Sequence, residues 1–273
     1  VKPLTVHEFD ALIVARHGFE PEGLIVAERD GEVLAYAHAG FGPAEPQGPS
    51  HRLDFELGTI AMLVVASGRG DPKIERGLVF AAERYLHRRG ARVLYAGGQY
   101  PVNPFYWGLY GGSEFAGILS AHVCFQRAVT AAGYEPTARS LMLELDLALP
   151  EVRDPRVALL RRQARVEIVE DVLPAGWWEA QAIGLFRPTR FRLLTRAEGT
   201  EIARATTWDI ACGFGVGDGR PRAGLIDVEV APDFRRKGFG RLLLIEISRH
   251  ARQQLTEILT VQTDESNAAG RGL

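Results

Sequence analysis

A basic turn containing two glycines carries the clearest chemistry in the sequence. Arg235, Arg236 and Lys237 are followed by Gly238 and Gly240, directly before a leucine-rich stretch with helical spacing. The first N–H groups of a helix lack intrahelical partners and carry a partial positive charge. Glycines let the backbone approach an anion closely, and basic side chains add donors. The turn therefore predicts a diphosphate-binding site.

The spacing of this turn separates it from two common nucleotide-binding motifs. R-x-x-G-x-G is shorter than the GxxxxGK[ST] phosphate loop, and no Ser or Thr follows that would hold magnesium. It also differs from GxGxxG, and no acidic residue follows about 20 positions later to bind a ribose. The alternative interpretation is a solvated basic turn with an ordinary glycine cap.

Composition places the chain in an ordinary globular class. Its 273 residues allow one large domain or two smaller ones, and the net charge of −2 gives no basic field for nucleic acid. No apolar run reaches membrane-spanning length, so we expect no membrane partner. The use of only two cysteines fits a reduced, cytoplasmic setting. The two cysteines form no CxxC motif, so no metal is predicted. The sequence does not specify an oligomeric state.

Strands and helices alternate in both halves of the sequence. In the first half, Asp30-Gly31 predicts a hairpin, Asp71 and Pro72 predict the start of a helix, and Gly90 predicts its end. The further elements expected are strands near 53–66, 91–98, 139–149, 165–172, 191–196, 201–210, 224–230 and 257–263, and helices near 121–133, 175–186 and 239–254.

The two halves look like distant copies of one unit. Each contains a strand, a turn, a helix, a second strand and then an asparagine, which is Asn103 in the first half and Asn267 in the second. Charges and prolines near residues 150–155 indicate a linker. We therefore predict two tandem α/β (α+β) domains, 1–152 and 153–273, each with a mostly antiparallel mixed sheet flanked by helices.

The stretch from Val230 to Leu244, V-x-P-x-x-R-R-K-G-F-G-x-x-L-L, resembles the acyl-CoA signature of the GNAT (Gcn5-related N-acetyltransferase) family. The family's Q/R-x-x-G-x-G/A pattern is present as Arg235, Gly238 and Gly240. Downstream, VQTDESNAAG resembles the family's next strand and the helix that begins at its asparagine. The close resemblance covers roughly residues 224–270, and the first half agrees with the family in outline alone.

The resemblance implies that acetyl-CoA is a cosubstrate. The backbone of Val228 and Val230 would pair with the pantetheine arm, and the strands at 224–230 and 257–263 would splay to admit the thioester. Asn267 would occupy the family's asparagine position. The turn residues would hold the diphosphate through Arg235, Arg236, Lys237, Gly238, Phe239 and Gly240. The first half lacks this spacing and carries Asp71 and Glu75 there, so we expect it to be a degenerate domain without a standard cofactor site.

The resemblance also implies the reaction, which is direct attack of a primary amine on the thioester within a ternary complex. Asp227 and Glu229 are the candidate bases, and alternation predicts that both lie on the face opposite Ile226, Val228 and Val230. In many family members a tyrosine after the asparagine helix protonates the thiolate. The sequence stops at Leu273, where that tyrosine is expected, so we expect residues to be missing at this end and name no acid.

An aromatic, glycine-rich loop in the first half is the candidate acceptor pocket. Tyr106 and Trp107 would form its wall, and Asn103 and Glu114 would supply polar groups. The alternative is core and interdomain packing. We expect a small-molecule amine as the acceptor. Two other possibilities stay open: a CoA-binding sensor or scaffold without transferase activity, and an acyl donor other than acetyl-CoA.

Overall fold

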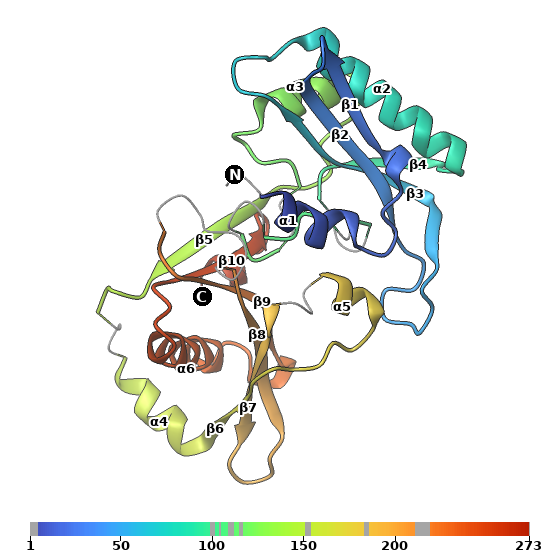
Figure 1. The fold of residues 1–273 in the computed structure, drawn as a ribbon. Helices are drawn as coiled ribbons and strands as arrows, with labels where there is room; N and C mark the ends of the chain where they lie inside the picture. The colour runs from blue at the N-terminus through green and yellow to red at the C-terminus, as the bar shows by residue number, and fades with distance from the viewer. Residues whose placement is uncertain are drawn as a thin grey trace.

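The computed structural model describes residues 5–98, 102–103, 105–108, 112–114, 117–150, 154–182, 186–210 and 219–272. Two mixed sheets form two lobes, each flanked by helices (Figure 1). This arrangement confirms the predicted fold class. Within the described residues, no helix combines the length and the apolar character needed to cross a membrane.

The first lobe contains a four-stranded sheet. Its strands, in spatial order, are β1 (Leu24–Arg29), β2 (Glu32–Pro43), β3 (Leu53–Val65) and β4 (Val93–Ala96). Its helices are α1 (Val6–Phe9), a π-helical turn (Asp10–Val14), a 3-10 turn (Pro21–Gly23), α2 (Pro72–Arg89) and α3 (Val123–Ala131). The predicted hairpin is present between β1 and β2, and both of its turn residues have positive φ.

The second lobe contains a six-stranded sheet. Its strands, in spatial order, are β5 (Ser140–Asp146), β10 (Ile258–Asp264), β9 (Arg222–Val230), β8 (Glu201–Asp209), β7 (Thr189–Thr195) and β6 (Ala164–Val169). Its helices are α4 (Pro155–Gln163), α5 (Trp177–Ala182), a 3-10 turn (Pro232–Phe234), α6 (Phe239–Gln253) and α7 (Ala268–Arg271).

One four-stranded unit occurs in both sheets. In β1-β2-β3-β4 the first two pairings are antiparallel and the last is parallel, and β7-β8-β9-β10 repeats this pattern. In each unit a helix, α2 or α6, connects the two parallel strands. The repeated pairing supports the duplicated fold that the order of elements predicts.

Strand β5 links the two lobes. It lies within 1–152, the range expected for the first domain, yet it pairs with β10 from Ser140↔Asp264 to Asp146↔Ile258. It runs between the lobes in Figure 1. Residues 151–153, where we expected the domain boundary, lie outside the described residues. The first half of the chain thus supplies a strand to the sheet of the second half.

Helix α4 was not predicted, because the prolines and charges near residue 150 indicated a linker. Asp154 caps this helix by accepting a hydrogen bond from the Arg156 N–H at 2.9 Å, and Pro155 is its first residue. Asp71 and Pro72 start α2 with the same pattern. The N-terminal signal was therefore present, and the linker expected at residues 150–155 overlaps this helix at its first residue, Pro155.

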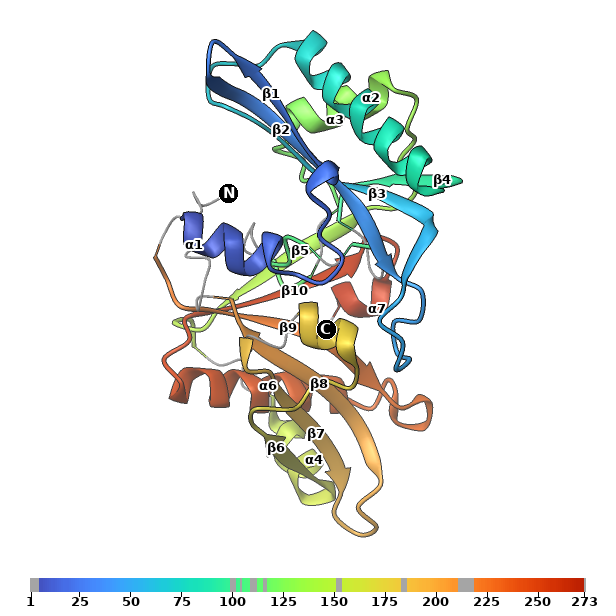
Figure 2. The same cartoon turned by 45° about the vertical axis from the view of Figure 1, so that its right-hand side comes forward.

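A third hydrophobic core joins the two lobes, besides the core of each lobe. The first half contributes Ile13, Ala61, Phe105 and Tyr106, and the second half contributes Trp178, Ala182, Phe186, Trp208, Ile210 and Ile226. Figure 2 shows α1 and α5 at this junction. Large aromatic side chains bury much apolar surface, so this core fixes the position of one lobe against the other.

The Trp208 ring leaves no space for a side chain at position 224. A Cβ atom on Gly224 would lie 2.7 Å from the Trp208 Nε1. We therefore predict that Gly224→Ala lowers the free energy of unfolding by about 1–3 kcal/mol through overpacking. Urea denaturation monitored by circular dichroism measures this change.

The matched control is Gly77→Ala on α2, where a Cβ atom would meet no other atom within 4 Å. This substitution should stabilise the protein by about 0.5–1 kcal/mol, because alanine favours a helix interior. Equal effects of the two substitutions would contradict the packing described for Trp208.

Candidate active site

The parallel strands β9 and β10 part halfway along their length. Their pairing runs from Arg222↔Ile258 to Leu225↔Val261 and then stops. Beyond this point β10 remains paired with β5, and β9 remains paired with β8. The edge of β9 that faces β10 is thus open from residue 226 to 230 among the described strands. This opening confirms the predicted splay.

A β-bulge at Asp227 changes which residues share a face. Asp227 has a φ of 53°, and the pairing of β9 with β8 shifts register between Arg204 and Thr206. Ile226 packs in the core between the lobes, whereas Val228 and Val230 pack on the core of the second lobe. The predicted common face of these three residues is therefore wrong, since a bulge inserts one extra residue into the alternation.

The basic turn lies at the open end of β9. The Arg235 Nε donates a hydrogen bond to the Val230 carbonyl at 2.8 Å, and Lys237 Nζ lies 5.7 Å from the centre of the Phe234 ring. Arg235, Arg236 and Lys237 are exposed. The side chain of Phe239 is buried in the core of the second lobe.

Gly238 precedes α6 with a φ of 90°, in the left-handed region that favours glycine. No side chain caps this end of the helix. Arg241 in the first turn forms an ion pair with Asp154 at 3.2 Å. At this helix start, the basic side chains that remain exposed to solvent are those of Arg235, Arg236 and Lys237 in the turn. An uncapped helix start beside exposed cations fits the diphosphate of acetyl-CoA.

The corresponding helix of the first half starts differently. The Asp71 carboxylate accepts a hydrogen bond from the Lys73 N–H at 2.8 Å at the N-terminus of α2. Glu75, in the first turn of this helix, is fully buried and paired with Arg127 at 2.6 Å. Two carboxylates therefore occupy the region where an anion would bind, and their charge disfavours a phosphate.

Asn267 acts as the cap of α7. Its side-chain oxygen accepts a hydrogen bond from the Gly270 N–H at 2.9 Å, and its Nδ2 donates to Thr263 Oγ1 at 3.0 Å. It also lines the cleft between the lobes. The predicted cofactor contact of Asn267 stays a prediction beside this observed capping role.

The aromatic loop divides into buried and cleft-lining residues. Asn103 is fully buried, and its Oδ1 accepts from the Phe105 N–H at 2.8 Å. The Tyr106 hydroxyl lies 3.0 Å from Nδ1 of His38, a histidine whose pKa burial lowers to about 3. Trp107 and Glu114 line the cleft, whereas Asn103 and Tyr106 are not among the residues that line it. For Asn103 and Tyr106, the structure therefore favours the alternative interpretation of this loop, which is core and interdomain packing.

Ser113 anchors this loop to the second sheet, which the sequence did not predict. Its carbonyl accepts hydrogen bonds from the indole N–H groups of Trp107 and Trp208, both at 2.9 Å. Its hydroxyl accepts from the Gln262 N–H at 3.1 Å, and Gln262 Oε1 accepts from the Glu114 N–H at 2.7 Å. The signal available in the sequence was a polar residue, Gln262, within the strand expected at 257–263.

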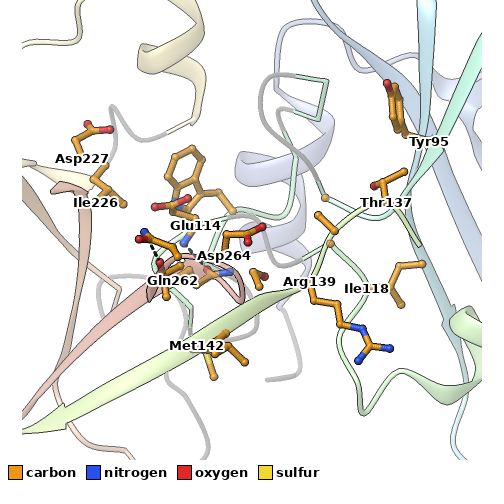
Figure 3. Close-up of a pocket in the computed structure, with 18 of the residues that line it drawn as sticks. Tyr95, Glu114, Ile118, Thr137, Arg139, Met142, Ile226, Asp227, Gln262 and Asp264 are labelled. Atoms are coloured by element: carbon orange, nitrogen blue, oxygen red, sulfur yellow. Dashed lines mark hydrogen bonds between the residues drawn. The ribbon is translucent and has the colours of Figure 1, made fainter. Parts of the chain in front are cut away.

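Three carboxylates lie near the opening between β9 and β10. Burial and, to a smaller extent, the negative charge of Asp227 raise the pKa of Glu114 to about 7. Burial also raises the pKa of Asp227, as does Glu179, whereas Arg190 and Arg204 oppose the shift. Glu229 is about half exposed and forms an ion pair with Arg204 at 2.6 Å. Figure 3 shows Glu114 between β10 and the strand that carries Asp227.

The cleft that contains these groups has a volume of about 2720 Å³ and lies between the lobes. On the second sheet it is lined by Arg204, Asp227 and Gln262, and on the first lobe by Tyr95. This volume exceeds that of an ordinary ligand pocket, which measures roughly 300–1,000 Å³. The cleft therefore has room for a cosubstrate together with an acceptor.

The model of the acetyltransferase (GNAT) family matches residues 167–273. This part of the chain is therefore similar to an acetyltransferase domain of the GNAT family. The match contains the splayed strands, the basic turn and Asn267, which confirms the resemblance seen in the sequence. No curated protein matches the chain.

Solved structures share the fold of the whole chain at low sequence identity. A tandem GNAT protein from the clavulanic acid biosynthesis pathway is 13% identical, with a TM-score of 0.60 over 90% of this chain and 75% of that one. A glucosamine N-acetyltransferase region of a fungal multi-domain β-N-acetylglucosaminidase is 13% identical, with a TM-score of 0.64 over 98% of this chain and 33% of that one. A GCN5-related N-acetyltransferase from Sphaerobacter thermophilus is 14% identical, with a TM-score of 0.52 over 88% of this chain and 70% of that one.

The raised pKa of Glu114 predicts a stability effect. Between about pH 4.5 and 7 the folded state binds more protons at Glu114 than the unfolded state, so its contribution to stability falls as pH rises through this window. We predict that Glu114→Gln raises the free energy of unfolding by about 1–3 kcal/mol at pH 8, after allowance for partial exposure.

At pH 4.5 the two proteins should be equally stable, because the carboxyl is then neutral in the folded wild type. Thermal unfolding at both pH values measures the difference. A gain of the same size at pH 4.5 would show that the raised pKa is not its cause.

Proposed function

We propose that the protein transfers an acetyl group from acetyl-CoA to a primary amine of a small molecule. The observation that carries this proposal is the opening between β9 and β10, which has an uncapped basic helix start at one end and carboxylates at the other. The donor and the acceptor would both be bound before the amine attacks the thioester directly.

Acetyl-CoA would lie along the open edge of β9. The backbone of Val228 and Val230 would pair with the pantetheine arm as an added strand does. The N–H groups from Arg235 to Gly240 would hold the diphosphate, supported by the side chains of Arg236 and Lys237. An N–H group at the bulge would polarise the thioester carbonyl.

The two halves would have separate tasks. The second half would bind acetyl-CoA, and the first half, whose α2 start is occupied by Asp71 and Glu75, would be a degenerate copy without a cofactor site. We keep the domain boundary expected near residue 152 as part of this proposal. Strand β5 precedes this boundary in the sequence and pairs with β10, which follows it. The acceptor would enter the cleft from the side opposite the diphosphate.

A charge reversal in the basic turn tests acetyl-CoA binding. The double substitution Arg236→Glu and Lys237→Glu should raise the Kd for acetyl-CoA at least about tenfold, because hydrogen bonds to charged groups contribute about 1.5–3 kcal/mol. Isothermal titration calorimetry measures the Kd.

The matched control is Lys73→Glu with Arg76→Glu, which reverses two exposed charges at the start of α2. This control should bind acetyl-CoA as the wild type does. The proposal fails if the wild type does not bind, or if both double variants lose the same affinity.

Turnover separates a transferase from a sensor. Release of free CoA thiol, measured with a panel of primary amines, should depend on the amine and should yield the N-acetyl product. Binding of acetyl-CoA without amine-dependent thiol release would instead favour a non-enzymatic sensor.

A further inference from the structure

We infer that Glu114, a residue of the first half, is the base that takes the proton from the acceptor amine at the site of the second half. This inference rests on the proposed function. It gives the first half a catalytic task, so the active site is complete only when both halves are in place.

The backbone of the loop holds Glu114 where β9 and β10 part. Gln262 follows directly after Val261, the last β10 residue that pairs with β9. The Gln262 side chain accepts the Glu114 N–H at 2.7 Å, and the Gln262 N–H is bound by the Ser113 hydroxyl at 3.1 Å. Glu114 is therefore fixed to the residue at which the opening begins.

Ser113 gives this attachment its rigidity. It is fully buried, and its carbonyl receives both indole N–H groups, one from each half of the chain. Trp208 is itself 1% exposed in the core between the lobes. A catalytic group needs a position fixed to within a fraction of an ångström, and side chains packed in a core provide it.

The charged groups around Glu114 suit a base that takes a proton from an ammonium ion. Asp227 faces it from β9, and no described lysine or arginine forms an ion pair with Glu114. The charged groups that surround Asp227 in turn are Glu179 on α5, Arg190 on β7, Arg204 on β8 and Glu229 on β9. With its pKa near 7, Glu114 is suited to accept protons at neutral pH.

Asp227 and Glu229 are less suited to this task. Glu229 is neutralised by Arg204 at 2.6 Å and is half exposed. Burial and Glu179 raise the pKa of Asp227 as well, but unlike Glu114 it lies beside two arginines, Arg190 and Arg204, whose positive charges favour its ionised form. We assign to Asp227 the electrostatic attraction of the incoming cation. The acceptor is accordingly an alkylamine that enters the cleft as its ammonium form.

The proton and electron changes balance as follows. The ammonium gives one proton to the Glu114 carboxylate and becomes a neutral amine. The amine lone pair forms the C–N bond to the thioester carbonyl carbon, and the C–S bond breaks with its electron pair on sulfur. The second proton leaves the nitrogen and is taken up by the thiolate. Glu114 then releases its proton to water, so one proton is produced for each amide formed.

The test compares amines that need a base with one that does not. At pH 7.5, benzylamine and spermidine are almost fully protonated, whereas hydroxylamine is already neutral. Glu114→Gln should lower kcat/KM for the best alkylamine by about 10²–10⁴-fold, the usual contribution of a general base. Transfer to hydroxylamine should stay within a few-fold of the wild-type rate.

Two further readouts do not depend on the rate at a single pH. The wild-type kcat/KM for the alkylamine should rise with an apparent pKa near 7, and this limb should be lost in Glu114→Gln. Infrared difference spectra of wild type against Glu114→Gln should show a carboxyl band that disappears with a midpoint near pH 7. The matched control is Glu28→Gln, an exposed carboxyl on β1 that is not among the residues lining the cleft and should change neither readout.

The outcomes separate the inference from the proposed function. If the wild type fails to bind acetyl-CoA in calorimetry, the proposed function is overturned, whatever the infrared titration shows. If it binds acetyl-CoA but transfers to no amine, the proposed transfer is overturned together with the assignment of Glu114. If it transfers to an alkylamine, the assignment of Glu114 alone is overturned by either of two results. These are equal losses with alkylamine and hydroxylamine, or an alkylamine pH profile unchanged in Glu114→Gln.

Discussion

The end of pairing between β9 and β10 is the constraint on which the rest of the structure depends. Two parallel strands that stay paired leave no backbone groups for a ligand, whereas strands that part after Leu225 and Val261 leave the β9 edge open. The structure keeps this opening without a loss of β10, because β5 pairs with β10 along its whole length. A strand from the first half therefore pairs with the part of β10 that β9 leaves unpaired.

The two copies of the fold differ where a phosphate would bind. The Asp71 side chain caps the N-terminus of α2, and Glu75 is buried there and paired with Arg127. Side chains of the protein itself therefore occupy this helix start. Helix α6 starts at a left-handed Gly238 without a side-chain cap. A free helix start costs stability in an isolated protein, since its N–H groups meet only water. Such a cost is typical of functional sites, and the self-capped copy shows how the same fold avoids it.

The sequence predicted the parts of the site that local rules decide. Glycine spacing, the N-cap of α2 and the alternation of the strands depend on neighbouring residues, and these predictions located the turn and its flanking strands. The parting of the strands was implied by the resemblance to the GNAT family. The bulge at Asp227 was missed, because one extra residue in a ladder is set by the partner strand β8. For the same reason Ile226 was placed on the wrong face. The N-cap signal of α4 was present at Asp154 and was masked by a linker-like composition.

Long-range contacts decided what the sequence left open. Glu114 was predicted as a polar group of the pocket, and its raised pKa follows from burial and from Asp227, which lies 113 positions later in the chain. Nothing in the local pattern of the loop indicates that Ser113 receives an indole N–H from Trp208. Such contacts become visible only when the core between the lobes is formed.

This core also explains why a degenerate copy would be retained. A carboxyl brought to the opening by a flexible loop would lose much of its effect, because positioning contributes to catalysis as strongly as chemical identity does. Phe105 and Tyr106 of the first half pack with Trp208 and Ile226 of the second, so the loop that carries Glu114 is held by a buried interface. Ile226 stands one residue before Asp227 on the strand that opens. The packing that joins the lobes and the geometry of the site are thus set by the same residues.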